Sequence, residues 1–248
     1  SKTDGARFIS DAVDRGAVAI LGAPEAAAEA KAHGVAFVSD SNPRKRLSLM
    51  AAEFFEVQPA KIAAVTGTNG KTSVASFLRQ IWVQLGHQAA SVGTLGIDAP
   101  SGHVPLSHTT PDPVELHMQL ARLSREGVDH LAIEASSHGL DQYRLDGVKL
   151  SAAGFTNITR DHLDYHTDFE HYFAAKMRLF AELLGPGGFA IVNADAPHGD
   201  EVVSIAAAHK VKVFTVGEKG EAIRLVARDA HASGQKMQLR FEGRDYSV

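Results

Sequence analysis

The chain has 248 residues, of which 44% are hydrophobic and 22% charged, so it can bury a core over about one to two domains and is too apolar to be disordered. Its net charge of -4 excludes the basic surface of a general nucleic-acid-binding protein. No apolar run reaches the roughly 18 residues of a membrane span. The lack of cysteine excludes disulfides and thiolate metal sites and agrees with a cytoplasmic location.

Residues 1–58 predict a small N-terminal α/β domain. Asn42 is a typical helix N-cap and Pro43 suits the first turn of the helix that follows. Gln58 and Pro59 then interrupt the pattern, so we expect a domain boundary there. The chain starts with Ser rather than Met, which indicates a piece of a longer protein. The expected elements are a helical segment at 8–15, strands at 17–21 and 35–38, and a helix that ends at 55.

Residues 59–248 predict a central domain in which strands alternate with helices. Helices of this length between strands imply crossover connections and a mostly parallel sheet covered by helices. Asp112, Pro113 and Glu115 form a helix-start signature. Short alternating strands joined by glycines predict a small antiparallel appendage at the end. Expected helices are 71–85, 113–126, 169–184 and 201–209, and expected strands are 62–66, 89–92, 130–134, 152–156, 189–193, 212–216, 223–227, 237–241 and 246–248.

The stretch G-T-N-G-K-T-S at residues 67–73 lies between a predicted strand and a predicted helix. Glycines let backbone N–H groups approach phosphates, and the helix N-terminus adds a positive dipole. In such a loop Lys71 would reach the β- and γ-phosphates and Thr72 would hold magnesium. The match to the common phosphate loop is incomplete because Val65 occupies its first glycine position, and a Gly-rich turn is the alternative.

Polar residues also follow the neighbouring strands. Glu134 ends an apolar strand, where a triphosphate site needs a carboxylate for its metal, although a surface Glu is equally compatible with that position. A polar loop is expected at 135–140. The cluster at 157–166 contains two histidines and two aspartates and is compatible with a magnesium site, a zinc hydrolase or solvated helix caps. By its position in a helix, Lys176 is typical of a solvated lysine.

Together these motifs closely resemble the Mur ligase family. The resemblance runs from the start of the chain to near its end, and within the family it favours the member that adds the third residue of the peptidoglycan stem. The ordered set is far more specific than the phosphate loop alone. The segments that carry it are 67–72, 108–112, 134–140, 160–166 and 174–176.

The resemblance implies an ATP-dependent ligase of peptidoglycan synthesis. ATP would phosphorylate the γ-carboxylate of D-glutamate in UDP-N-acetylmuramoyl-L-alanyl-D-glutamate, and the amine of a diamino acid would attack the acyl phosphate. The acceptor would be diaminopimelate or lysine, with meso-diaminopimelate expected. Two magnesium ions would compensate the charge of the anions brought together. In the family the lysine that matches Lys176 is carbamylated by carbon dioxide and becomes a metal ligand.

The resemblance also assigns roles to individual residues. Catalytic roles fall to Lys71, His162 and Lys176. The ATP-binding residues would be Gly67, Thr68, Asn69, Gly70, Lys71, Thr72 and Ser73. The substrate-binding residues would be Thr3, His108, Thr109, Thr110, Ser136, Gln142 and Arg144. The metal ligands would be Thr72, Glu134, His162 and Lys176 as its carbamate.

The pattern after residue 216 lacks a third αβ domain, so we expect a monomeric fragment without the C-terminal ligase domain. Such a fragment would bind ATP and magnesium, and could bind the UDP-linked substrate, without completing ligation. Two alternatives stay open. One is a stand-alone phosphate-loop kinase or phosphohydrolase that acts on a small molecule, and the other is a non-catalytic nucleotide-sensing module.

Overall fold

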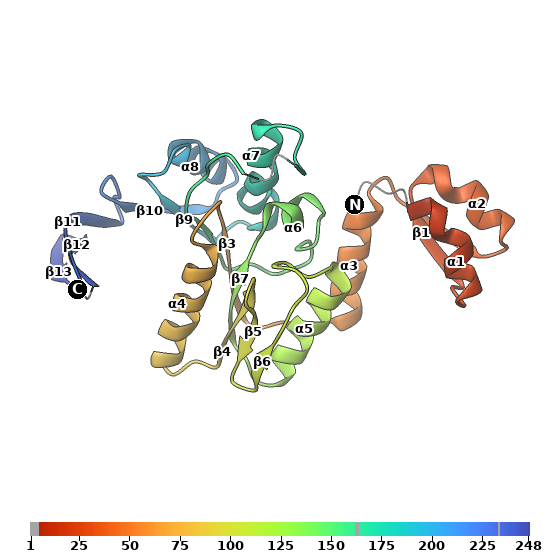
Figure 1. The fold of residues 1–248 in the computed structure, drawn as a ribbon, viewed down its shortest axis with the longest axis horizontal. Coiled ribbons are helices and arrows are strands. Elements are labelled where there is room, and N and C mark those ends of the chain that lie inside the picture. Colours follow the sequence, from red (N-terminus) through yellow and green to blue (C-terminus); the bar gives the residue numbers. More distant parts are fainter. Residues whose placement is uncertain (1–4, 162–163, 233) are drawn as a thin grey trace.

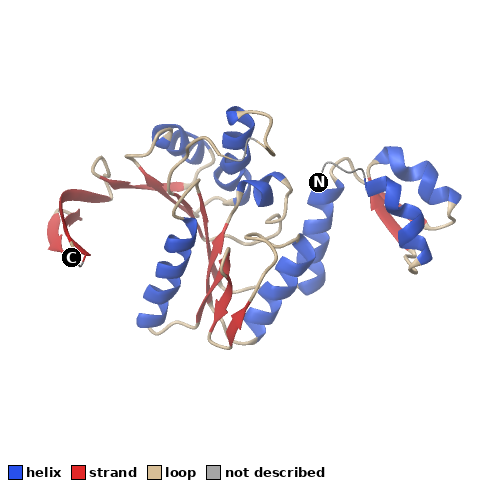
Figure 2. Ribbon diagram, viewed as in Figure 1, coloured by secondary structure: helices blue, strands red, loops and turns tan. Residues whose placement is uncertain are grey.

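The computed structural model describes residues 5–161, 164–232 and 234–248 (Figures 1 and 2). It contains one two-stranded and one eleven-stranded sheet. The small sheet belongs to an N-terminal unit in which β1 and β2 pair in parallel, with Ala19 opposite Ala36. Figure 1 shows this unit beyond the end of α3, apart from the large sheet. Its elements are the 3-10 turns Gly5–Phe8 and Pro24–Ala26, helices α1 (Ile9–Asp14) and α2 (Ala27–Ala32), and strands β1 (Ala19–Gly22) and β2 (Ala36–Ser39).

Helix α3 (Pro43–Phe55) starts as predicted, because the Asn42 side chain accepts a hydrogen bond from the backbone N–H of Lys45. The helix lies beside α5 of the central part of the molecule. Buried Ser48 also joins α3 to the segment after residue 141, by donating hydrogen bonds to the carbonyl oxygens of Arg144 and Asp146. The last helix before the predicted boundary at residue 58 therefore packs on a helix from the part of the chain after that boundary.

The large sheet has a parallel centre, and its C-terminal strands form the expected antiparallel appendage, whereas the antiparallel edge formed by β5 and β6 was not predicted. Its order is β13-β12-β11-β10-β9-β8-β3-β7-β4-β5-β6, and the strands from β10 to β4 run parallel. The strands are β3 (Lys61–Thr66), β4 (Ala89–Gly93), β5 (Gly96–Ala99), β6 (Gly102–Val104), β7 (His130–Glu134), β8 (Ala152–Phe155), β9 (Phe189–Asn193), β10 (Lys212–Gly217), β11 (Ile223–His231), β12 (Gly234–Phe241) and β13 (Arg244–Ser247).

The helices of the central part follow the predicted starts closely. Asp112 caps α5 by accepting hydrogen bonds from the backbone N–H groups of Val114 and Glu115. The predicted helix 169–184 changes to a π-helical turn at Leu179–Leu183. The helices are α4 (Lys71–Gln84), α5 (Pro113–Arg125), α6 (Ser137–Asp141), α7 (Phe169–Arg178) and α8 (Gly199–Ala208). Within the described residues, none of the helices is both long and apolar enough to cross a membrane.

The sheet is packed unequally on its two faces. The main core includes Leu116 of α5, Tyr172 of α7 and Val202 of α8. A smaller cluster under α4 contains Ala75 and Ala132. Figure 2 shows α4 and α5 on opposite sides of the strands. Because successive residues of a strand face opposite sides, β7 contributes to both clusters while its two ends stay free for polar groups.

Candidate functional site

The phosphate-loop candidate connects β3 to α4 and has the backbone conformation that its glycines allow. Gly70 has a φ of 86° and Gly67 a φ of 149°, both unfavourable for other residues. A Cβ atom on Gly67 would lie 2.0 Å from Thr156 Oγ1. Gly70 is the N-cap of α4 and provides no capping side chain, so the first N–H groups of a 14-residue helix face the loop without a side-chain cap.

A second loop, which follows β8, holds the phosphate loop in place. The Asn157 side chain accepts a hydrogen bond from the Asn69 N–H (3.0 Å) and donates one to the Asn69 carbonyl oxygen (3.1 Å). The Thr68 N–H donates to the Asn157 carbonyl oxygen at 2.9 Å. Thr156 Oγ1 also donates to the Asn69 carbonyl oxygen. These reciprocal bonds fix the loop before any ligand arrives, which lowers the cost of ordering it on binding.

Lys71 lies folded back over its own loop. Its Nζ donates hydrogen bonds of 2.9 Å to the carbonyl oxygens of Gly67 and Thr68. Burial lowers the pKa of this amine, while the negative charges of Glu134 and Asp161 oppose the shift. A phosphate group would therefore have to replace two carbonyl acceptors to engage Lys71.

Glu134 is buried, with 2% of its surface exposed, so the alternative of an ordinary surface carboxylate is wrong. Its carboxylate accepts hydrogen bonds from the Thr72 hydroxyl (2.9 Å), the Thr94 N–H (2.9 Å) and the Thr94 hydroxyl (3.2 Å). A Cβ atom on neighbouring Gly93 would come within 2.0 Å of Glu134 Oε1. The carboxylate is thus held by hydrogen bonds and close packing beside the phosphate loop.

Lys176 is also buried, with 1% exposed, which contradicts the solvated position expected from its helix. Its Nζ donates a hydrogen bond of 2.9 Å to the Gly67 carbonyl oxygen and lies 4.6 Å from the centre of the Tyr172 ring. Burial and the charge of Lys71 lower the pKa of Lys176 to about 7, against the attraction of Asp161. A large part of this amine is therefore neutral near pH 7.

A cavity of about 580 Å³ opens beside the two lysines. It brings together all six described residues that were predicted to bind substrate, although they come from three separate segments of the chain. The residues that line it are Lys71, Thr94, His108, Thr109, Thr110, Ser136, Ser137, His138, Gln142, Arg144, Tyr165 and Lys176.

A polar network fixes Arg144 at the wall of the cavity. Its guanidinium donates to the Thr110 carbonyl oxygen (2.6 Å) and to Gln142 Oε1 (2.8 Å). Gln142 Nε2 donates to the Tyr165 hydroxyl, which in turn donates to Asp141. Burial lowers the pKa of Arg144, but arginine stays protonated in proteins. The cavity therefore holds a permanently positive group suited to a carboxylate.

The segment predicted as a polar loop at 135–140 is partly helical, which corrects that expectation. Ser136 caps the short helix α6 by accepting from the Gly139 N–H at 3.0 Å. Thr110 lies against this helix and donates to the Glu134 carbonyl oxygen at 2.9 Å. Thr110 and Ser136 are thereby tied to the same strand end as the Glu134 carboxylate.

Three predicted site residues are either not described or not part of the groups above. Thr3 and His162 are outside the described residues, and Ser73 is exposed on the first turn of α4. Motif analysis did not assign Thr94, Thr156 or Tyr165. Thr94 and Thr156 directly follow buried parallel strands, and polar residues at that edge of a sheet are the signal that would have identified them.

Comparison with known proteins provides an independent result. The family model of the Mur ligase middle domain matches residues 65–248. The UDP-N-acetylmuramoyl-L-alanyl-D-glutamate--2,6-diaminopimelate ligase of Bradyrhizobium diazoefficiens is 54% identical over 254 residues, covering 100% of this chain and 51% of its own. The ligase of the same name from Agrobacterium fabrum is 48% identical over 248 residues, with 100% and 50% covered. The chain spans about half the length of the curated relatives it matches.

Solved structures agree with the fold. A structure of UDP-N-acetylmuramoyl-L-alanyl-D-glutamate--2,6-diaminopimelate ligase superposes with a TM-score of 0.85 at 29% identity and covers 98% of this chain and 49% of that chain. The MurF ligase from Thermotoga maritima, in complex with ADP, has a TM-score of 0.61 at 14% identity and covers 100% and 52%. At that identity the second likeness shows the fold alone.

Proposed function

Because this chain belongs to the Mur ligase family, we propose that it forms the ATP-binding core of a ligase that joins diaminopimelate to UDP-N-acetylmuramoyl-L-alanyl-D-glutamate. The names of the relatives support the choice of substrates, and the phosphate loop supports the choice of ATP. The observation that carries the proposal is the single cavity shared by Lys71, Lys176 and Arg144. It is a place where a nucleotide phosphate and a substrate carboxylate would meet.

The chemistry explains why these groups are needed together. A carboxylate is a poor electrophile, so its oxygen first takes the γ-phosphoryl group of ATP, and ADP leaves. The amine of the second substrate then attacks the acyl phosphate carbon, forms the amide and expels phosphate with loss of a proton. No protein side chain forms a covalent bond to the substrates in these two steps. Lys71 and the N-terminus of α4 would hold the phosphates, and Arg144 would hold a substrate carboxylate.

The residues beside the phosphate loop fit a magnesium ion. Thr72 and Glu134 place a hydroxyl and a carboxylate oxygen 2.9 Å apart, and such oxygen ligands are those that magnesium prefers. When bound, the ion would neutralise charge on the phosphates. His162 is proposed as a ligand for a second ion, which the family resemblance implies. In this arrangement Thr94 is a positioning residue, since it donates two hydrogen bonds to Glu134.

Lys176 fits the carbamate that the resemblance implies. A carbamate forms when a neutral amine bonds to the carbon of carbon dioxide and gives up a proton, so a buried amine with a pKa of about 7 is well suited to the reaction. The product would be an anion in place of a cation. Incubation with ¹³C-bicarbonate should give a carbamate NMR signal that is absent from Lys176→Arg. A spectrum that is the same for both proteins would contradict the assignment.

Substrate recognition can be tested with two matched ligands. In the presence of a non-hydrolysable ATP analogue, UDP-N-acetylmuramoyl-L-alanyl-D-glutamate should bind at least about tenfold more tightly than UDP-N-acetylmuramoyl-L-alanine, because only the first ligand carries the D-glutamate carboxylates, one of which Arg144 would recognise. Arg144→Ala should abolish the difference, while Arg125→Ala, on the last turn of α5, should keep it. Isothermal titration calorimetry measures both affinities. Equal binding of the two ligands to the unaltered chain would overturn the proposal.

The proposal includes a cytoplasmic location and a monomeric state. ATP and the UDP-linked substrate are cytoplasmic metabolites, and a chain without cysteine needs no oxidising compartment. Sedimentation equilibrium should give the mass of one chain at micromolar concentration, and a mass of two chains would contradict the monomer.

A further inference from the structure

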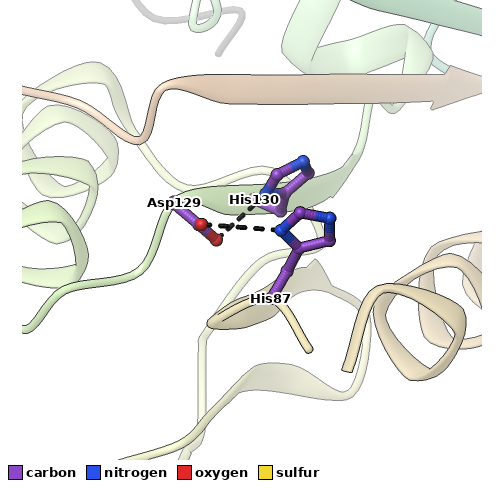
Figure 3. Close-up of side chains that lie close together, drawn as sticks. All are labelled: His87, Asp129 and His130. Carbon is purple, nitrogen blue, oxygen red and sulfur yellow. Dashed lines mark hydrogen bonds and ion pairs between the residues drawn. The ribbon is translucent and has the colours of Figure 1, made fainter. Parts of the chain in front are cut away.

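A second group of metal-type donors lies at the opposite end of the sheet from the phosphate loop. His87, Asp129 and His130 each offer one ligand atom, and these atoms lie within 4.8 Å of one another. Figure 3 shows both imidazole rings beside the carboxylate, with an interaction from each ring to it. The distances are 2.9 Å from His130 Nδ1 and 3.7 Å from His87 Nδ1 to the Asp129 oxygens.

The backbone holds the three residues together. His87 lies in the turn between α4 and β4, and its N–H donates to the Trp82 carbonyl oxygen at 3.0 Å. The Asp129 N–H donates to the Gln88 carbonyl oxygen at 2.9 Å. β4 and β7 then run in parallel from this point, with Ala89 opposite His130. The convergence of the donors therefore follows from the pairing of two neighbouring strands.

The side chains are placed to accept an ion from solvent. The His87 and Asp129 side chains are 40% and 47% exposed, whereas His130 is 17% exposed and packs against Trp82 with 5.1 Å between ring centres. The two imidazole rings lie 3.9 Å apart. One histidine is thus a fixed donor, and the two exposed side chains have room to close around an ion.

We propose that His87, Asp129 and His130 form a binding site for a divalent transition metal of the zinc type. Two imidazole nitrogens and a carboxylate oxygen are ligands that zinc accepts, with the remaining position open to water. Ligand atoms of tetrahedral zinc lie about 3.3 Å apart, given metal–ligand distances near 2.0 Å. Small rotations of the exposed His87 and Asp129 side chains would bring the donors to that separation.

This site is separate from the proposed nucleotide site in both place and chemistry. His130 starts β7 and Glu134 ends it, so the two sites lie about 13 Å apart along the strand. The donors near Glu134 are oxygens, which suit magnesium, whereas imidazole nitrogens favour zinc, nickel or copper. The inference therefore stands whether or not the chain binds ATP.

Zinc titration of the metal-free 248-residue chain, followed by calorimetry in millimolar magnesium, tests the site. We expect one zinc ion per chain. His87→Ala and Asp129→Asn should each weaken binding by at least about tenfold, because each removes one of three protein ligands. Cobalt substitution should give a visible absorption spectrum that His87→Ala removes.

Two variants serve as controls. His103→Ala disrupts an exposed His103–Asp98 pair (2.8 Å) on the β5–β6 hairpin, where no second histidine among residues 5–161, 164–232 and 234–248 completes a metal-type cluster, and should leave zinc affinity within about twofold. Lys71→Ala should also leave it unchanged, which separates this site from the phosphate loop. The proposal is overturned if no saturable zinc site appears, or if His87→Ala binds zinc as the unaltered chain does.

Discussion

Strand β7 carries a polar group suited to metal at each end, and the two ends are built differently. At the carboxyl end, Glu134 is 2% exposed and its carboxylate accepts three hydrogen bonds. At the amino end, Asp129 is 47% exposed and its partners are two histidine rings. In Figure 1 the carboxyl end of β7 points towards α6 and the amino end towards the lower end of α4.

The difference separates two ways of making a site. A buried carboxylate is costly to desolvate, so the fold must hold it in place with hydrogen bonds before the ligand arrives. An exposed cluster costs little to form and gains its geometry only when an ion holds it. Substitutions at the carboxyl end should therefore affect both stability and nucleotide binding, and those at the amino end should affect zinc binding alone.

The largest expected effect is on nucleotide affinity at the carboxyl edge. Lys71→Ala should weaken ATP binding on the order of a hundredfold, because it removes the cation that would face the phosphates. Lys61→Ala, at the amino end of β3, is the matched control and should change the affinity less than twofold. Fluorescence titration with a labelled ATP analogue measures both. If both variants lose ATP affinity equally, the nucleotide does not bind specifically at the carboxyl edge of the sheet.

The close fit around Glu134 predicts a loss of stability. Gly93→Ala should lower the free energy of unfolding by about 1–3 kcal/mol, because the new methyl group would meet the carboxylate at 2.0 Å. Gly185→Ala introduces the same methyl group where no atom lies within 4 Å and should change stability by less than about 0.5 kcal/mol. Urea unfolding compares the two. If the Gly93→Ala protein is as stable as the control, the Glu134 side chain can move aside at little cost and is not held rigidly.

An isosteric pair compares the two carboxylates of the same strand region directly. Glu134→Gln should reduce the magnesium-dependent gain in ATP affinity by about tenfold, since an amide replaces the proposed anionic ligand. Asp129→Asn should leave that gain intact. Titrations of labelled ATP with and without magnesium give the answer. If both variants lose the magnesium-dependent gain in ATP affinity, the two ends of β7 do not act independently.

The last test concerns the pH dependence of stability. The pKa of Lys176 is about 7 in the folded chain against 10.5 in its ordinary state, so the unfolded chain binds more protons between these values. The free energy of unfolding should therefore rise with pH from about 7 to 10, by at most about 1.4 kcal/mol per pH unit from this group. Below pH 7 both states are protonated and the slope vanishes.

The measurement uses urea unfolding at pH 7, 8 and 9 in buffer free of carbon dioxide. Lys176→Met should remove this contribution to the slope, whereas exposed Lys149→Met should retain it. Slopes that are identical in Lys176→Met and in the unaltered chain would place the amine in a more polar setting than its burial indicates.

Features set by local sequence were predictable. The Asn42 and Asp112 caps depend on residues within one helical turn, and both start helices as expected. Helix α6 was missed because it has only five residues and contains a glycine, so no periodic pattern develops. The β5–β6 hairpin was missed for a similar reason, as strands of four and three residues are too short to show alternation.

In the candidate site, too, the features set by local sequence were predictable and those set by long-range packing were not. The phosphate loop has a compact motif, and the carboxyl-edge position of Glu134 follows from strand order. The burial of Lys176 depends on how α7 packs over the phosphate loop, 109 residues away in the chain, and nothing in its helix distinguishes it from a solvated lysine. Only the resemblance to a family pointed to it. The Thr94 contacts likewise depend on the pairing of β4 with β7.

The carbonyl oxygen of Gly67 accepts hydrogen bonds from the amines of both Lys71 and Lys176, each at 2.9 Å. The two amines therefore share one hydrogen-bond acceptor. When an incoming phosphate draws Lys71 away, this oxygen keeps Lys176 as its remaining lysine partner. If Lys176 becomes a carbamate, its Nζ keeps one N–H that can still donate to this oxygen, but the side chain then carries a negative charge instead of a positive one. A ligand that engages Lys71 and a change in the charge of Lys176 would therefore act on the same backbone carbonyl group, although the two lysines belong to different helices.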